Sequence, residues 1–325
     1  MSRSDKYKIL SMPQPLEKVR QLLEDFAEIE VGSSLPRDEL LEKIDSYDGI
    51  LASGSLEYDE ELFRRAGERL KIVARVGVGY DNVDVEAATE SGVLATNTPG
   101  VMAESVAEHT LLLILAVAKG LPQADRGVRE GHWSWAEYRG TELWCQTLGQ
   151  IGLGRIGRLV ANKVRDCLSM RVLAHDPYAL EEKFLEIGAK SVELETVLGE
   201  ADVITINAPL TEETRGLIGE KELRAMKKSA ILVNTGRGPI IDEGALIEAL
   251  QKGEIAGAGL DVFEQEPPNE DNPLLEMENV VLTPHQASNT ETGVENMFMT
   301  AARDVVAVLK GERPKFPLNP EVIDC

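Results

Sequence analysis

The chain has 325 residues, of which 43% are hydrophobic, and it carries a formal net charge of -22 at pH 7. Single hydrophobic cores rarely grow beyond roughly 250–300 residues, so we expect two domains. The long-range field of so acidic a protein repels polyanions, which argues against a nucleic-acid binder and against a protein of anionic membrane surfaces.

The cysteines and the apolar runs indicate the cellular compartment of the protein. Cys145, Cys167 and Cys325 are too few and too scattered for a disulfide framework or a zinc site, which favours a reducing compartment. Residues 1–5 lead into a short apolar strand without a signal-type segment, and the longest apolar run, 111–118, falls far short of the roughly 20 residues of a membrane span. We therefore expect a cytoplasmic protein.

Short apolar runs alternate with amphipathic helical stretches along the chain, which is typical of βαβ units and predicts an α/β fold with parallel sheets. The first part has strands at 7–12, 49–53 and 72–76 and helices near 16–26, 37–46 and 84–91. A long helix at 103–119 follows a boundary at Asn97-Thr98-Pro99-Gly100. A second series then offers six strands, at 147–151, 171–175, 203–206, 230–234, 257–260 and 280–283, before a last helix at 291–309.

A glycine-rich loop opens the second series. Strand 147–151 runs into Gly152-Leu153-Gly154-Arg155-Ile156-Gly157 and then into a helix. Gly152 permits a tight turn, Gly154 close approach of a pyrophosphate, and Gly157 close packing of helix on strand. Asp176 ends the next strand about 20 residues later, where its carboxylate can bond ribose hydroxyls and repel a 2′-phosphate. This context favours NAD over NADP, and over a turn that binds nothing.

Beyond this loop the chain resembles the D-isomer-specific 2-hydroxyacid dehydrogenases, the family of phosphoglycerate dehydrogenase, glyoxylate/hydroxypyruvate reductase and D-lactate dehydrogenase. The matching segments are, in order, RVGVGYDNVD at 75–84, NTPG at 97–100, the glycine loop, PLT at 209–211, NTGRG at 234–238, GLDVFEQEP at 259–267 and TPH at 283–285. The resemblance implies two Rossmann-like domains, with an NAD-binding domain at 101–289 inserted into a substrate domain made of 1–100 and 290–325. It also implies an active site in the cleft between the domains, and a homodimer that pairs through the cofactor domain.

The reaction of this family can be argued from three residues. Reduction of a 2-oxo acid needs a cation for the carboxylate and carbonyl oxygens and an acid that protonates the oxygen. Arg237 lies in a glycine-flanked loop after a strand, and Glu266 and His285 follow two further strands at the same sheet edge. A carboxylate beside the imidazole favours its protonated form, so His285 is the predicted acid, and the base in the oxidation direction. The alternatives are a surface salt bridge for Arg237 and a structural role for His285.

The resemblance also assigns the remaining contacts, residue by residue. The backbone of Val78 and Gly79, with Arg75, is expected to bind the substrate, and no cluster of residues has metal-ligand spacing. The other histidines, His109, His132 and His175, are interpreted as a packed helix residue, a loop residue and a strand-end residue. Cofactor contacts are expected from Arg155 and Ile156 at the pyrophosphate, Ala208 and Thr235 along the cofactor site, and Asp261 and Ser288 at the nicotinamide end.

Three departures from the family pattern concern the cofactor domain. Cys145-Gln146 stands where the family often has Gly-Lys, and Gln150 replaces an isoleucine of the following strand. For these we expect changes in local packing without loss of cofactor binding. Asn207 stands where the family usually has histidine, which keeps hydrogen-bonding capacity and removes a titratable group.

The loop after strand 49–53 bears on the substrate. Phosphoglycerate dehydrogenases have basic residues at the positions of Ala52 and Leu56 and near Trp135, and only Arg75 remains of that set. We therefore expect a small unphosphorylated 2-oxo acid such as glyoxylate or hydroxypyruvate. Phosphoglycerate dehydrogenase is the alternative, supported by Arg75 and by the sequence GTEL at 140–143. An NAD-sensing corepressor, which can keep the same three catalytic positions, is an alternative of another class.

Overall fold

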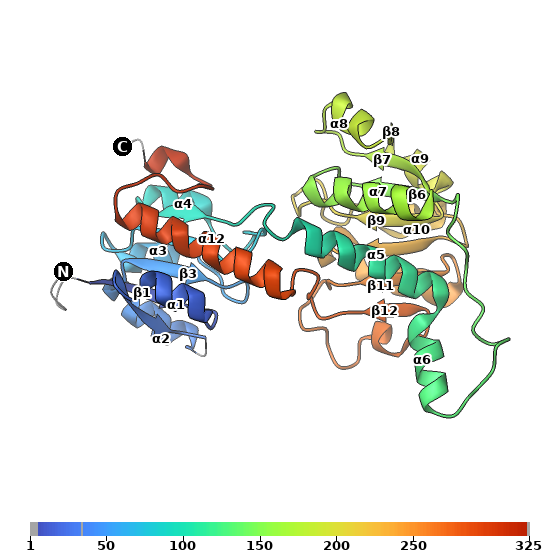
Figure 1. Cartoon of the computed structure of the whole chain (residues 1–325), viewed down its shortest axis with the longest axis horizontal. Coiled ribbons are helices and arrows are strands. Elements are labelled where there is room, and N and C mark those ends of the chain that lie inside the picture. Colours follow the sequence, from blue (N-terminus) through green and yellow to red (C-terminus); the bar gives the residue numbers. More distant parts are fainter. Residues whose placement is uncertain (1–5, 34, 324–325) are drawn as a thin grey trace. The chain divides into compact units, whose positions relative to one another are not determined.

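The computed structural model describes residues 6–33 and 35–323, so residues 1–5 and Cys325, which the sequence analysis used, lie outside the described residues. The chain forms two compact units, unit 1 from Met1–Met102 with Glu291–Cys325, and unit 2 from Ala103–Thr290. Each unit is built on a parallel sheet with helices on both faces, which confirms the predicted α/β class. Figure 1 shows both sheets and their helices.

Unit 1 has a five-stranded sheet in the order β2-β1-β3-β4-β5. One face packs on α1 and α12, the other on α2, α3 and α4. Two of these strands and α3 were not predicted. The strands are β1 (Tyr7–Ser11), β2 (Ala27–Val31), β3 (Gly49–Ala52), β4 (Ile72–Arg75) and β5 (Leu94–Thr96), and the helices are α1 (Glu17–Leu23), α2 (Arg37–Lys43), η1 (Ile44–Ser46), α3 (Glu60–Ala66), α4 (Val85–Glu90), α12 (Glu291–Leu309) and η4 (Pro320–Val322).

Unit 2 has a seven-stranded sheet in the order β12-β11-β10-β9-β6-β7-β8, with α5 and α7 on one face and α9, α10 and α11 on the other. The prediction of six strands was wrong by one, because β8 has only two residues and both are exposed. The strands are β6 (Thr147–Ile151), β7 (Arg171–His175), β8 (Lys190–Ser191), β9 (Val203–Ile206), β10 (Ile231–Asn234), β11 (Gly257–Leu260) and β12 (Val280–Leu282). The helices are α5 (Ala103–Lys119), α6 (Leu121–Arg129), α7 (Arg155–Leu168), α8 (Glu181–Glu186), α9 (Leu194–Glu200), α10 (Glu220–Ala225), η2 (Gly238–Ile240), α11 (Glu243–Lys252) and η3 (Pro273–Glu276).

The strand order of unit 2 places its loops for ligand binding. From β6 the chain moves to β7 on one side, and it later returns to β9 on the other side of β6. The order of strands therefore reverses between β6 and β9, and the carboxyl ends of strands at such a switch point are where open α/β sheets bind ligands. The loops after β6, β9, β10, β11 and β12 all leave the sheet at this edge because every strand pair is parallel.

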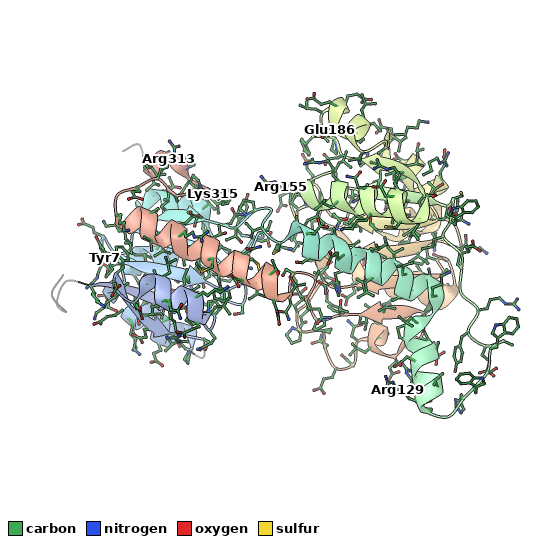
Figure 2. The ribbon with its side chains drawn as sticks, in the orientation of Figure 1. Tyr7, Arg129, Arg155, Glu186, Arg313 and Lys315 are labelled. Carbon is green, nitrogen blue, oxygen red and sulfur yellow. The ribbon has the colours of Figure 1, made fainter. Side chains whose placement is uncertain are left out.

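Helix α5 is a core helix, since its apolar side chains pack on the sheet and on α7. Figure 1 shows the two helices side by side. Within residues 6–33 and 35–323, no single helix has both the length and the apolar character to cross a membrane. The pair of α5 and α6 meets that requirement only when taken together, with a bend of 64° between them. Figure 2 shows α6, which ends at Arg129, and the loop that follows it standing away from the sheet of unit 2.

Candidate functional site

The glycine loop after β6 has the form that a bound pyrophosphate requires. Gly152 has φ +85°, and a Cβ there would lie 2.8 Å from the Ala208 nitrogen. A Cβ on Gly157 would lie 2.1 Å from the Gly152 carbonyl oxygen, so neither position accepts a side chain. A Cβ on Gly154 would meet nothing within 4 Å, and Gly154 is the N-cap of α7, where no side chain caps the helix. The loop therefore leaves open space at a helix N-terminus whose N–H groups suit a phosphate.

Asp176 adjoins this loop. One of its carboxylate oxygens accepts the Leu153 N–H at 2.7 Å, and the other accepts the Tyr178 N–H at 3.0 Å. The side chain thus ties the end of β7 to the glycine loop and places a negative charge beside it. An open phosphate cradle with a carboxylate at the end of the second strand fits NAD, and a 2′-phosphate would meet that carboxylate unfavourably.

The predicted acid and its partner carboxylate lie together. His285 Nδ1 is 2.7 Å from Glu266 Oε2, and Glu266 Oε1 accepts the Phe263 N–H at 3.1 Å. Burial raises the pKa of Glu266, but the hydrogen bond and charge of His285, the Phe263 N–H and the charge of Arg237 outweigh it and hold the pKa below its usual value. Glu266 is therefore an anion that fixes the ring of His285 through Nδ1, and Nε2 is the ring nitrogen that points away from Glu266.

Arg237 is held by the loop after β10. The fully buried side chain of Asn234 accepts the Gly236 N–H at 2.9 Å and donates to the Arg237 carbonyl at 2.8 Å. The guanidinium donates to the Gly236 carbonyl at 2.8 Å and acts electrostatically on Glu266. The loops after β10, β11 and β12 thus bring Arg237, Glu266 and His285 to one edge of the sheet.

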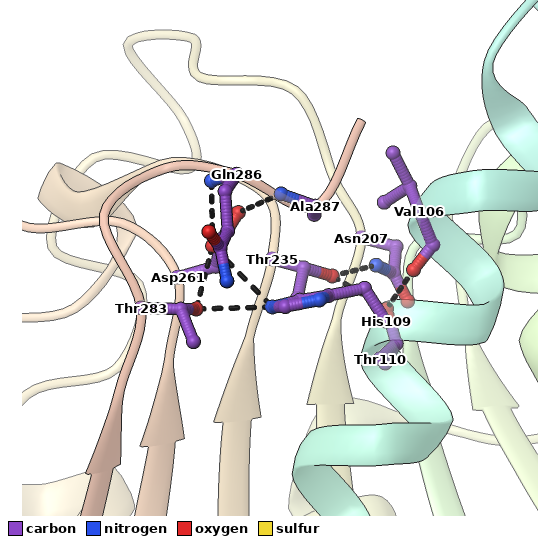
Figure 3. Close-up of polar contacts among 9 residues, drawn as sticks. All are labelled: Val106, His109, Thr110, Asn207, Thr235, Asp261, Thr283, Gln286 and Ala287. Carbon is purple, nitrogen blue, oxygen red and sulfur yellow. Dashed lines mark hydrogen bonds and ion pairs between the residues drawn. The ribbon is translucent and has the colours of Figure 1, made fainter. Parts of the chain in front are cut away.

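A cluster of polar residues supports the loop that carries His285. His285 itself has φ +50°, a conformation that costs a non-glycine residue roughly 1 kcal/mol or more, and its N–H donates to the Asp261 carbonyl at 2.8 Å. The Asp261 carboxylate accepts the Gln286 and Ala287 N–H groups, both at 2.9 Å, and the Thr283 hydroxyl at 2.6 Å. Figure 3 shows the bonds from Gln286, Ala287 and Thr283 converging on the Asp261 carboxylate.

His109 joins this cluster from α5. Its Nε2 lies 3.0 Å from the Thr283 hydroxyl and 3.5 Å from Asp261 Oδ1 (Figure 3). Burial raises the pKa of Asp261, but the hydrogen bonds from His109, Thr283 and the loop N–H groups outweigh burial and hold the pKa below its usual value, so Asp261 is a buried anion. His109 was predicted to be a packed helix residue and Asp261 a nicotinamide contact. Their shared support of the His285 loop was not predicted, although a histidine within an apolar helix was an available signal.

The residues expected to bind substrate belong to unit 1. Arg75 ends β4, and its guanidinium lies so close to Gly54 and Gly77 that a Cβ on either would be 2.5 Å from one of its nitrogens. The Val78 carbonyl accepts from Asn97 at 2.7 Å. Among the described residues, no acceptor takes the N–H groups of Val78 and Gly79, so they are available to a carboxylate.

The other predicted positions divide between the site and its surroundings. Ala208 packs on the glycine loop, and the Thr235 hydroxyl accepts from Asn207 at 2.8 Å. Ser288 follows the Asp261-bound loop, and Ile156 lies in the first turn of α7. His175 bonds the Val192 carbonyl at the end of β7, away from the predicted chemistry. In the described part of the chain no group of three potential metal ligands comes together, and the absence of a metal stays a prediction.

A doubly wound sheet with a glycine loop at its switch point, and an Arg–Glu–His set at the same edge, defines a dinucleotide-dependent dehydrogenase domain. Residues 111–287 match the model of the D-isomer specific 2-hydroxyacid dehydrogenase NAD-binding domain. The chain belongs to the D-isomer specific 2-hydroxyacid dehydrogenase family, as its motifs predicted, and NAD is confirmed as the cofactor of this domain.

The proteins similar to this chain include glyoxylate reductases and D-3-phosphoglycerate dehydrogenases. The chain is 44% identical over 321 residues to a glyoxylate reductase of Aeropyrum pernix, covering 96% of this chain and 94% of the relative. It is 43% identical over 303 residues to a D-3-phosphoglycerate dehydrogenase of Archaeoglobus fulgidus, covering 93% of this chain but 57% of that relative, so it spans little more than half of that protein's length. A glyoxylate reductase structure from Paecilomyes thermophila superposes with a TM-score of 0.89 at 30% identity, covering 98% and 99% of the two chains.

Proposed function

We propose that the protein is an NAD-dependent 2-oxoacid reductase and D-2-hydroxyacid dehydrogenase, with a small unphosphorylated substrate of the glyoxylate or hydroxypyruvate type. The observation that carries this proposal is the 2.7 Å bond between His285 and Glu266, with Arg237 close enough to act on the same carboxylate. We assign cofactor binding to unit 2 and substrate binding to unit 1, with its Val78 and Gly79 N–H groups.

Each residue of the set has one task in this mechanism. NAD, when bound, supplies or accepts the hydride. The guanidinium of Arg237 binds the carboxylate and the carbonyl oxygen of the oxo acid and stabilises the negative charge that develops on that oxygen. His285 donates the Nε2 proton to the oxygen during reduction and removes it during oxidation. Glu266 orients the ring through its 2.7 Å contact with Nδ1.

The end of β3 and the loop that follows it support an unphosphorylated substrate. Ala52 and Leu56 occupy the positions where the resemblance placed basic residues in phosphoglycerate dehydrogenases, and an apolar side chain offers a phosphate no charge-assisted bond. Arg75, which pairs with Ala52 across β3 and β4, is the feature that favours phosphoglycerate dehydrogenase as the second candidate. The named relatives include both activities.

We also propose that two copies pair through unit 2. Trp133 and Trp135 are 88% and 90% exposed in the isolated chain, and Leu121, Val128 and Trp144 are more than half exposed on the same segment. Large aromatic side chains gathered on one exposed segment mark a protein interface. The free thiols of Cys145 and Cys167 support the expected reducing, cytoplasmic location.

The test is NADH oxidation by the purified protein with glyoxylate, hydroxypyruvate, pyruvate and 3-phosphohydroxypyruvate, repeated with NADPH. We expect the highest kcat/KM with NADH and glyoxylate or hydroxypyruvate. His285→Ala should lower kcat by about 10²–10⁴-fold while NADH affinity stays near normal. Preference for the phosphorylated acid would establish the second candidate. NADH binding without turnover of any oxo acid would favour a corepressor-like binding protein.

A further inference from the structure

A buried polar side chain lies directly beneath the glycine loop. Gln150, in β6, is fully buried, and its Nε2 donates to the Gly152 carbonyl at 3.0 Å and reaches the Ile151 carbonyl at 3.3 Å. The same Nε2 donates to Asn207 Oδ1 at 3.0 Å, and Oε1 accepts the Thr205 hydroxyl at 2.8 Å. Only the amide nitrogen can face these acceptors, because Oε1 in its place would oppose three other oxygens. Gln150 is thus completely satisfied in the core.

The hydrogen bonds continue from Asn207 to α5. Asn207 Nδ2 donates to the Thr235 hydroxyl at 2.8 Å, which lies 2.8 Å from the Thr110 hydroxyl. The Thr110 hydroxyl donates its only hydrogen to the Val106 carbonyl at 2.8 Å, so in the bond between the two hydroxyls Thr235 must be the donor and Thr110 the acceptor. Figure 3 shows this part of the chain of bonds, from Asn207 to Val106.

Every side chain in this series therefore donates in one direction, in the order Thr205, Gln150, Asn207, Thr235, Thr110. Aligned hydrogen bonds polarise and strengthen one another in a low-dielectric interior. The series joins two functional loops, because Gln150 holds the glycine loop and Thr235 lies two residues before Arg237.

We propose that Gln150 and Asn207 act together as positioning residues of the NAD site. Gln150 turns the Gly152 carbonyl toward the core, where a Cβ on Gly157 would also meet it, and this fixes the direction of the N–H groups that follow. Asn207 ties that loop to the one that precedes Arg237. The pair stands where the resemblance placed isoleucine and histidine, so this chain has a neutral amide pair with no titratable member at these positions. The inference rests on the proposed function only in taking NAD as the ligand.

The experiment compares NADH dissociation constants, measured by fluorescence titration without oxo acid, for four variants. Gln150→Leu removes the donor to Gly152 and should raise the Kd about tenfold, as should Asn207→Leu. Because both act through one unit, Gln150→Leu with Asn207→Leu should raise the Kd little more than either change alone. Thr205→Val is the matched control, because it removes the hydrogen bond from Thr205 to Gln150 Oε1 and leaves the bond from Gln150 to the glycine loop in place. Its Kd for NADH should stay within about twofold of the parent value.

A purely structural role would lower the stability of these variants without this pattern in the Kd. Equal Kd values in all four variants, or effects of the two leucine changes that multiply in the double variant, would overturn the proposal. If Gln150→Leu fails to fold, Asn207→Asp takes its place. This change keeps the acceptor for Gln150 but removes the donor to Thr235, and it should raise the Kd for NADH about threefold. Because the readout omits the oxo acid, a wrong substrate assignment would leave this result untouched.

Discussion

At the scale of single residues, Cys145 is the clearest conflict between residue type and backbone. It has φ +60°, a left-handed conformation that suits glycine, and it stands where the resemblance placed glycine. Cys145→Gly should therefore raise the free energy of unfolding by roughly 0.5–1 kcal/mol, since relief of backbone strain exceeds the added entropy of the unfolded chain. Denaturant unfolding followed by circular dichroism measures this change in the free energy of unfolding.

Cys167 provides the matched control for this change. It is also an exposed free cysteine, but it lies within the helical backbone of α7. Cys167→Gly should lower the free energy of unfolding by about 0.5 kcal/mol, because glycine is the poorer helix former. If both glycine variants were destabilised to the same degree, the strain assigned to Cys145 would be absent.

Residue patterns in the sequence predicted parts of the site that are local in the chain. The glycine loop and the segments around Arg237, Glu266 and His285 each carry their signature within a few residues, and the structure brings the three side chains to one sheet edge. The supporting bonds are not local. Gln150 and Asn207 are 57 residues apart, and His109 and Thr283 are 174 apart. Such pairs become visible only when the sheet order is known.

At the scale of elements, length and position in the sheet decided what could be predicted. The long helices α5 and α12 were predicted with the bounds that the structure has, because many turns repeat one apolar face. The missed strands are short or lie at sheet edges. In β2 the exposed Glu28 and Glu30 alternate with apolar residues, which suits an edge strand and weakens the apolar run. The two residues of β8 give no period at all.

Helix α12 carries a buried carboxyl group whose titration should be visible in stability. Asp304 is 3% exposed, and one of its oxygens accepts the Lys315 N–H at 2.8 Å. Burial raises the pKa of Asp304 above its usual value, more than the Lys315 and Phe316 N–H groups and the charge of Lys315 lower it. As pH rises through the interval between the unfolded and folded pKa, the folded state holds the proton longer, so stability falls and the loss persists at neutral pH.

Asp304→Asn should remove this loss, because the amide is neutral at every pH and its oxygen can still accept the Lys315 N–H. We expect the variant to be more stable than the parent at pH 7 by roughly 1 kcal/mol, with the difference vanishing as pH falls to the usual pKa of aspartate. Urea unfolding at a series of pH values measures the stability difference at pH 7 and its decrease as pH falls. A stability difference that stayed constant across the series would show that packing, and not ionisation, distinguishes the two proteins.

At the scale of the whole molecule, two opposed properties bear on assembly. A net charge of -22 makes two copies repel, so a stable pair needs an interface with strong apolar contacts. The segment from α6 to β6 offers them, and Gly127 fixes it by packing on Tyr138, whose hydroxyl would clash with any Cβ at that position. The amino-acid composition predicts the charge repulsion, but the exposure of the tryptophans can be known only from the fold.

Trp133→Ser with Trp135→Ser should convert the proposed dimer to a monomer. Sedimentation velocity on the parent is expected to show a single dimeric species, and the double variant a species of half the mass, with NADH still bound because the glycine loop is unchanged. Leu185→Ser is the matched control, since Leu185 is also a large exposed apolar residue of unit 2, on α8, outside the proposed interface. A monomeric parent would exclude the dimer, whereas a dimer that both variants retain would place the interface on another surface.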